Sequence, residues 1–162
     1  MTELSSTVSI RGAVFPADTA TVSALLEDYL RQTEAEKADR GLAPDASSLP
    51  GRYAREVARP AESLAGTRVL IGSVGGVDCG IVVISTTDAA GSELKRFWTT
   101  PPARGHGVGT ALISEALRLA ARPVRLSVWE WRTPAARMYR RLGFSVAPSW
   151  DKRPELLCLE LV

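Results

Sequence analysis

Three alternating glycines and one arginine form the segment of this chain that is best suited to bind an anion. The segment reads Arg104-Gly105-His106-Gly107-Val108-Gly109-Thr110. Because glycine has no Cβ, the backbone here can approach a ligand closely. The N–H groups and the positive dipole end of a following helix favour a phosphate, and the Arg104 guanidinium can add charge-assisted hydrogen bonds to it.

Two other phosphate-binding motifs do not fit this segment. A P-loop requires Lys-Ser/Thr after its last glycine, whereas Thr110-Ala111 follows here. The dinucleotide fingerprint is G-x-G-x-x-G, whereas the spacing here is G-x-G-x-G. His106 is the one histidine of the sequence. Its place inside the loop favours a role for its backbone rather than its ring, so it is not assigned as a base.

The apolar periodicity predicts the elements that must position this loop. Helices are expected from the N-cap Asp18 to Asp39, over Gly51–Ala58, from the glycine loop to about Ala121, and from the N-cap Thr133 to the stop at Gly143. A loop is expected over about 41–51 and a turn at 89–91. Strands are expected over Ser9–Val14, Thr67–Ser73, Val77–Thr86, Ser92–Thr99, Val124–Trp129, Phe144–Ala147 and Leu156–Val162. Hairpin strands followed by strand–helix–strand indicate an α/β sheet with antiparallel and parallel pairs.

Length and composition are those of one globular domain. The chain has 162 residues, of which 45% are hydrophobic and 23% charged. We expect a single domain over residues 8–162, preceded by a disordered segment 1–7. The sequence has no apolar run of about 20 residues and no secretory signal at its start, so we expect a cytoplasmic protein without membrane contact. Cys79 and Cys158 lie in apolar strands and are expected to be buried thiols.

The charge is distributed unevenly along the chain. Residues 1–92 hold 8 Lys/Arg against 12 Asp/Glu, whereas residues 93–153 hold 12 against 4. Two explanations of this asymmetry are equally good. The charges can simply form a solvated surface, or the two halves can meet partners of opposite charge, a polyphosphate for the basic half and a cation for the acidic half. The sequence lacks the lysine-rich runs and the interleaved aromatic and basic residues of nucleic-acid binders, so no nucleic-acid partner is expected.

Three separated motifs, in the same order, resemble the GNAT N-acetyltransferase superfamily. Arg104-x-x-Gly107-x-Gly109 matches the family signature R/Q-x-x-G-x-G/A. The strand 93–98 resembles the one that precedes this loop in many bacterial members. Ala136-x-x-Tyr139-x-x-x-Gly143-Phe144 resembles the end of a later family helix. The resemblance is strong over residues 93–147 and weaker over 8–92.

The resemblance implies an acyl-CoA N-acyltransferase fold. This fold is a mixed, mostly antiparallel sheet with a splayed parallel strand pair, flanked by about four helices. It further implies acetyl-CoA as co-substrate and no metal. Backbone groups near Phe97, Trp98 and Thr99 would pair with the pantetheine arm, and residues 104–110 would take the pyrophosphate.

The implied reaction is direct attack of an amine on the thioester, which needs an acid and a base. Tyr139 matches the family tyrosine that serves as the acid, and its alternative role is a core aromatic residue. Glu93 lies eleven residues before Arg104, where related enzymes carry a general base that can act through a water. The alternative is a strand carboxylate paired with Lys95 or Arg96, and Glu130 is the second candidate base.

Arg132 departs from the family pattern. Many members carry an asparagine at this position, seven residues before the tyrosine, where it contacts the cofactor arm. The Arg132 guanidinium can donate to a carbonyl there, or reach phosphate or an acidic acceptor.

The acceptor site is expected near the tryptophans and the acidic first helix. Trp98 and Trp129 are expected in the core, whereas Trp131 and Trp150 are candidates to line the site and to hold an amine by cation–π contact. Exposed glutamates of the first helix can steer a cation, namely Glu27, Glu34 and Glu36.

These features favour an acetyl-CoA-dependent N-acetyltransferase that acts on a primary amine of a small molecule. An enzyme that acetylates protein lysines or N-termini is the second hypothesis. A coenzyme A-binding regulatory module without catalysis is a third, from a different class of protein. The sequence allows a homodimer without indicating one.

Overall fold

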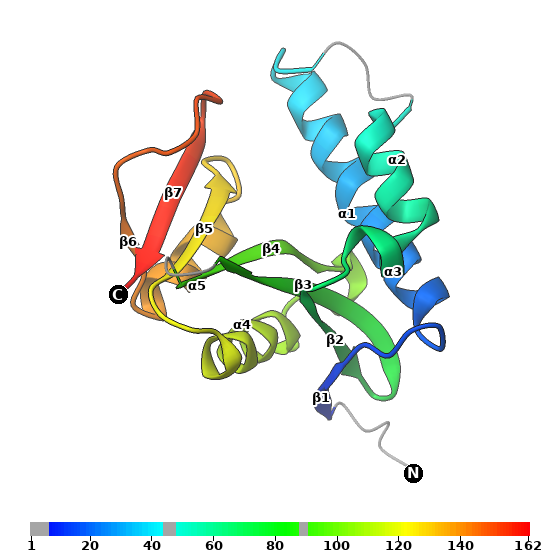
Figure 1. Ribbon diagram of the computed structural model, residues 1–162. Coiled ribbons are helices and arrows are strands. Elements are labelled where there is room, and N and C mark those ends of the chain that lie inside the picture. The colour runs from blue at the N-terminus through cyan, green and yellow to red at the C-terminus, as the bar shows by residue number, and fades with distance from the viewer. Residues whose placement is uncertain (1–6, 44–47, 88–90) are drawn as a thin grey trace.

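The computed structural model describes residues 7–43, 48–87 and 91–162. In these residues, seven strands form one mixed sheet that runs through the centre of the molecule (Figure 1). The sheet order is β1-β2-β3-β4-β5-β7-β6, with β1 Val8–Gly12, β2 Arg68–Val74, β3 Val77–Thr87, β4 Gly91–Thr99, β5 Val124–Trp129, β6 Ser145–Val146 and β7 Leu156–Leu161. The β4–β5 pair is parallel and the other pairs are antiparallel. The predicted fold class is therefore confirmed.

Helices cover both faces of this sheet. They are α1 Thr19–Asp39, α2 Gly51–Ala58, α3 Pro60–Ser63, α4 Val108–Leu119 and α5 Thr133–Arg141. In Figure 1, α1, α2 and α3 lie on one side of the sheet and α4 on the other. None of the helices in the described ranges combines the length and the hydropathy that a membrane span requires.

Most predicted elements differ from the observed ones by one or two residues. The prediction is correct at both ends for α2 and β5, whereas α4 ends at Leu119 instead of Ala121. The short helix α3 is not among the predicted elements, because its four residues, which begin with Pro60 at the first helical position, are too few to show an apolar period. The predicted disordered segment 1–7, the loop 41–51 and the turn 89–91 lie partly outside the described residues. Of the segment 1–7, the structure describes Thr7, and its carbonyl accepts a hydrogen bond from Gly75 N–H.

The two predicted helix N-caps have different outcomes. Asp18 is the N-cap residue of α1, as predicted, but its side chain makes no capping hydrogen bond. Its carboxylate instead accepts hydrogen bonds from Val14 N–H and from Arg11, both at 2.9 Å. The hydrogen bond from Val14 N–H has the larger effect, and together with the one from Arg11 it lowers the pKa of Asp18. Thr133 is the first residue of α5 and Arg132 precedes it. Asp18 thus stabilises the connection between β1 and α1 instead of the helix start.

The two faces of the sheet carry separate apolar clusters because successive strand residues point to opposite sides. Val69 and Ile71 of β2 belong to the cluster that includes α1 and Leu64, which directly follows α3, whereas Leu70 belongs to the cluster that includes α4 and α5. Strand β3 alternates in the same way. Both predicted thiols, Cys79 and Cys158, are buried, as are Trp98 and Trp129.

Two strand glycines bring α4 close to the sheet. A Cβ at Gly72 would lie 2.7 Å from Val108 Cγ2, and a Cβ at Gly80 would lie 2.7 Å from Leu112 Cδ1. Val108 is the first residue of α4, so this contact positions the start of the helix that the glycine loop leads into.

We expect Gly72→Ala to lower the free energy of unfolding by about 1–3 kcal/mol, because the added methyl group overpacks the stiff Val108 side chain. Thermal unfolding followed by circular dichroism measures the change. Gly12→Ala is the matched control, since a Cβ at this glycine meets nothing within 4 Å. Equal melting temperatures for the two variants would contradict this account of α4 packing.

Candidate active site

Strand β4 carries one extra residue near its centre. Val83 of β3 pairs with Lys95 and Ile81 pairs with Trp98, so two residues of β4 oppose one residue of β3. Arg96, within this β-bulge, has a φ of 56°, which is uncommon for a residue with a side chain. Its guanidinium makes a bidentate ion pair with Glu56 of α2, at 2.7 and 3.0 Å. This pair fixes the bulge against the helix.

Strands β4 and β5 separate beside this bulge. Their parallel pairing joins Ser92 to Val124 and Glu93 to Arg125, and within the described residues it extends no further. A bulge bends the strand that contains it. From Leu94 to Trp98, the edge of β4 that faces β5 therefore has no partner strand within the described residues. Backbone N–H and C=O groups at such an edge require hydrogen-bond partners, and an extended ligand with amide groups can supply them.

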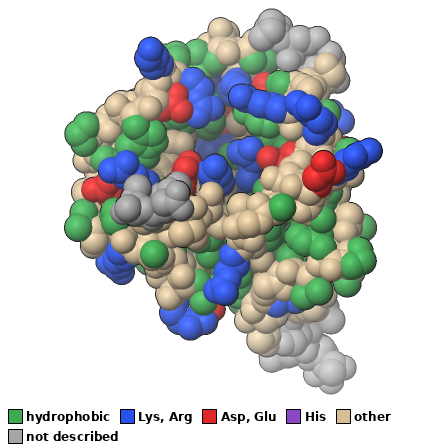
Figure 2. Space-filling model, in the orientation of Figure 1, with side chains coloured by type: hydrophobic (Ala, Val, Ile, Leu, Met, Phe, Trp, Pro, Cys, Tyr) green, Lys and Arg blue, Asp and Glu red, His purple; other side chains and the backbone are tan. Residues whose placement is uncertain are grey.

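The space between these strands is a cleft of about 1350 Å³. Figure 2 shows a hollow on this face of the molecule, with Lys and Arg side chains in it and around it. Twelve of the predicted site residues line the cleft: Glu93, Phe97, Trp98, Thr99, Arg104, Gly105, Gly107, Val108, Gly109, Thr110, Arg132 and Tyr139. His106, Glu130 and Trp150 are not among the residues that line it.

The glycine loop meets the cleft at the start of α4. Gly105 and Gly107 both have a φ of 85°, and a Cβ at either would meet nothing within 4 Å. A Cβ at Gly109, in contrast, would lie 3.1 Å from Phe97 Cζ. The Thr99 hydroxyl is buried there without a hydrogen-bond partner. Open space beside a helix N-terminus and an unpartnered hydroxyl fit the phosphate and amide groups of a coenzyme A molecule.

Arg104 and His106 flank this loop. Arg104 Nε donates to the Thr99 carbonyl at 3.1 Å, and its guanidinium lies over the Trp98 ring at 4.7 Å. The His106 ring contacts the Ala103 carbonyl through Nδ1 at 3.1 Å. The imidazole thus binds the preceding turn and does not line the cleft, in line with its backbone-only assignment.

Tyr139 lies on α5 and is one of the residues that line the cleft. It is buried and contacts Phe97 and Phe144 edge-on, with ring centroids 6.0 and 5.7 Å away. Burial raises the pKa of Tyr139, and the nearby Arg132 opposes this shift only in part. The phenol therefore stays protonated at neutral pH and can donate a proton or a hydrogen bond.

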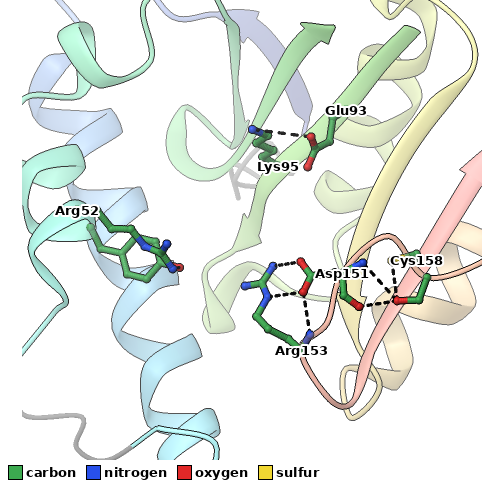
Figure 3. Close-up of polar contacts among 8 residues, drawn as sticks. Arg52, Glu93, Lys95, Asp151, Arg153 and Cys158 are labelled. Carbon is green, nitrogen blue, oxygen red and sulfur yellow. Dashed lines mark hydrogen bonds and ion pairs between the residues drawn. The ribbon is translucent and has the colours of Figure 1, made fainter. Parts of the chain in front are cut away.

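The two candidate bases differ in position. Glu93 lines the cleft at the base of the splayed strands, and its carboxylate lies 3.8 Å from Lys95 Nζ (Figure 3). Both side chains are half exposed. Glu130 is exposed outside the cleft lining, and only its backbone N–H bonds to Glu155. The geometry favours Glu93 over Glu130.

Arg132, in the loop after β5, connects this loop to α1. Its Nε donates to Glu36 at 3.0 Å and its Nη2 to the Thr33 hydroxyl at 2.8 Å. The Trp131 indole N–H donates to the same carboxylate. Burial alone raises the pKa of Glu36, but the hydrogen bonds from Arg132, Trp131 and Gln32 outweigh it and the pKa is lowered. Sequence reasoning missed this contact because the partners are almost one hundred residues apart.

The expected amine site on the tryptophans is occupied by side chains of the protein itself. Trp129 and Trp131 stack at 4.8 Å, Arg40 lies over Trp131 at 4.2 Å, and Arg153 lies over Trp129 at 5.6 Å. Trp150 is 42% exposed and is not among the residues that line the cleft, whereas Trp131 lines it.

The glutamates of α1 are paired as well. Glu27 binds Arg31, Glu34 binds Lys37, and Glu36 binds Arg132. The expectation that they attract a cationic acceptor loses its support. Within the described ranges, no three His, Cys, Asp or Glu side chains gather as metal ligands do.

Comparison with known proteins identifies the chain's relatives. Residues 65–146, half of the chain, match the family model of the acetyltransferase (GNAT) domain. No curated protein matches the sequence. An acetyltransferase structure from Streptococcus agalactiae is 15% identical, with a TM-score of 0.69 over 96% of this chain and 98% of that one. The yncA structure from Salmonella typhimurium, which contains its cofactor acetyl-CoA, is 22% identical, with a TM-score of 0.65 over 95% and 92%. A nourseothricin acetyltransferase structure is 26% identical, with a TM-score of 0.52 over 60% and 65%.

We expect Glu36→Gln to destabilise the protein by roughly 1–2 kcal/mol at pH 7, because the Arg132 charge loses its partner. Since the folded-state pKa of Glu36 is lowered, its contribution to stability is complete above the ordinary glutamate pKa of 4.5 and is lost as the pH falls through the folded pKa. Chemical denaturation at pH 7 and at pH 3 measures the difference. Glu27→Gln, on the same helix, is the control, and an equal effect of both variants would contradict the role of Glu36.

Proposed function

The chain belongs to the acetyltransferase (GNAT) family, and we propose that it moves the acetyl group of acetyl-CoA to a primary amine of a small molecule. One observation carries the proposal. The unpaired edge of β4 leads, through the short 3-10 turn Pro101–Ala103, into the glycine loop at the start of α4. A strand edge suits the amides of a pantetheine arm and a helix start suits a pyrophosphate. That the yncA structure contains acetyl-CoA supports the proposal.

The proposed cofactor site uses backbone groups more than side chains. The main chain of Phe97, Trp98 and Thr99 would pair with the pantetheine arm, and the N–H groups of 105–110 would take the pyrophosphate. Arg104 would add positive charge beside the loop. When bound, acetyl-CoA supplies a thioester carbonyl that an amine can attack. Because Arg132 is held by Glu36 and Thr33, we assign it to positioning α1 beside the cleft.

Tyr139 is the proposed general acid. Its raised pKa keeps the phenol protonated, and the dry surroundings that raise it also raise the pKa of a departing thiol, so the two groups stay matched. Glu93 is the proposed base. Its half-exposed carboxylate at the base of the cleft can accept the ammonium proton through a water.

We expect Tyr139→Phe to lower kcat roughly 100-fold or more, with acetyl-CoA affinity unchanged, because it removes the proton donor and keeps the ring packing. Thiol release from acetyl-CoA with a panel of small amines, and calorimetry with acetyl-CoA, measure the two quantities. Tyr29→Phe, which also lines the cleft, is the control and should keep kcat. If acetyl-CoA binds but no amine or peptide releases thiol, the chain is a regulatory module.

We expect Glu93→Gln to lower kcat/KM about 10- to 100-fold near neutral pH. The remaining decrease of kcat/KM toward acidic pH should then follow only the protonation of the acceptor amine. The pH profile of kcat/KM measures this. Glu130→Gln, outside the cleft, should retain the wild-type profile. An unchanged rate and an unchanged acidic limb in Glu93→Gln would remove this residue from the mechanism.

A further inference from the structure

Every acidic side chain that lines the cleft is paired with a cationic side chain that also lines it. The carboxylates belong to Glu34, Glu36, Glu56, Glu93 and Asp151, and their partners are Lys37, Arg132, Arg96, Lys95 and Arg153 respectively. The Asp151 pair is bidentate, and the Arg153 side chain, aided by its backbone N–H, holds the pKa of Asp151 at about 2. No carboxylate among these residues is left over for a cationic ligand.

Four arginines of the cleft have no such partner. Within ion-pair distance, no acidic residue of the described ranges lies near Arg40, Arg52, Arg104 or Arg141. The cleft therefore carries excess positive charge, and Figure 2 shows Lys and Arg side chains around the hollow. Positive charge in a concave site concentrates anionic ligands.

Only some of this charge is needed for the proposed cofactor. Arg104 precedes the glycine loop at the start of α4, and Arg141 ends α5. Arg40 instead follows the last residue of α1, and Arg52 lies at the start of α2. In Figure 1 these ends of α1 and α2 project from the side of the sheet opposite to α4. Arg40 and Arg52 thus lie on the other side of the sheet from the helix that is proposed to bind the pyrophosphate.

Aromatic rings hold both of these guanidinium groups in place. Arg40 lies over Trp131 at 4.2 Å, and Trp131 is fixed by Trp129 and Glu36. Arg52 lies over Tyr53 at 4.6 Å and donates Nη2 to its hydroxyl at 2.9 Å. In Figure 3, Arg52 lies on one side of β4 and the Asp151–Arg153 pair on the other. A guanidinium stacked on a ring keeps edge N–H groups for a carboxylate and loses little entropy on binding.

We infer that the acceptor carries a carboxylate as well as its amine, and that Arg40 and Arg52 bind this carboxylate. The inference rests on the proposed function, since it places the amine in the cleft near Tyr139. An amino acid has the required chemistry, whereas a polyamine would bring further positive charge to a site without a free carboxylate. The expected acceptor is therefore an amino acid.

Matched acceptors test the charge requirement. We expect kcat/KM for a free amino acid to exceed that for its carboxamide, and that for spermidine, by roughly tenfold or more. Phosphoethanolamine separates a carboxylate site from a general anion site. The inference would be overturned if carboxamides or polyamines were acetylated with the same kcat/KM as amino acids. A higher kcat/KM for phosphoethanolamine than for every amino acid would also overturn it.

Substitutions locate the site. We expect Arg52→Gln and Arg40→Gln each to raise KM for the preferred amino acid roughly tenfold while kcat and acetyl-CoA affinity stay unchanged. Arg55→Gln is the control, because Arg55 lies exposed on α2 outside the cleft lining. Calorimetric titration of amino acids into the coenzyme A-bound protein gives the same comparison without turnover. If only Arg40→Gln and Arg52→Gln weaken amino-acid binding, the inference is supported even when no acceptor is acetylated. The inference is overturned if the wild-type protein binds no amino acid, or if Arg55→Gln weakens binding as much as the two cleft substitutions do.

Discussion

The separation of β4 from β5 depends on one extra residue in β4 and on the ion pair that holds it. At Arg96 the backbone takes a left-handed conformation that residues other than glycine rarely adopt. The bidentate contact between Arg96 and Glu56 fixes this part of β4 against α2. Because the bulged strand bends, pairing with β5 stops after Glu93 and the remaining strand edge has no partner strand within the described residues. Without this bend the two strands would satisfy each other's backbone groups, and no ligand would be needed to do so.

The glycine loop depends on how closely α4 approaches the sheet. Gly72 and Gly80 leave room for Val108 and Leu112, so the first turn of the helix lies against β2 and β3. Gly109 allows the same turn to approach Phe97 of β4. The positive end of the helix thus lies beside the unpaired strand edge.

Electrostatic pairing determines the character of the cleft. Glu36 and Arg132 join α1 to the loop after β5, and the other carboxylates of the cleft are likewise neutralised. What remains is the positive charge of arginines stacked on aromatic rings. A surface that composition alone describes as acidic in one half and basic in the other becomes, after folding, a cleft with a positive excess.

The sequence by itself determined the features that depend on neighbouring residues. Glycine spacing and the apolar periodicity predicted the loop, most elements and the mixed sheet, because backbone conformation and helix or strand patterning act over a few residues. The family motifs placed Tyr139 and the glycine loop at one site, and both line the cleft. Only the tertiary structure decided which partners Glu36, Arg132 and Arg96 find, and that Trp150 lies outside the cleft. Side-chain charges reach across the fold to residues far apart in sequence, and no local pattern records that distance.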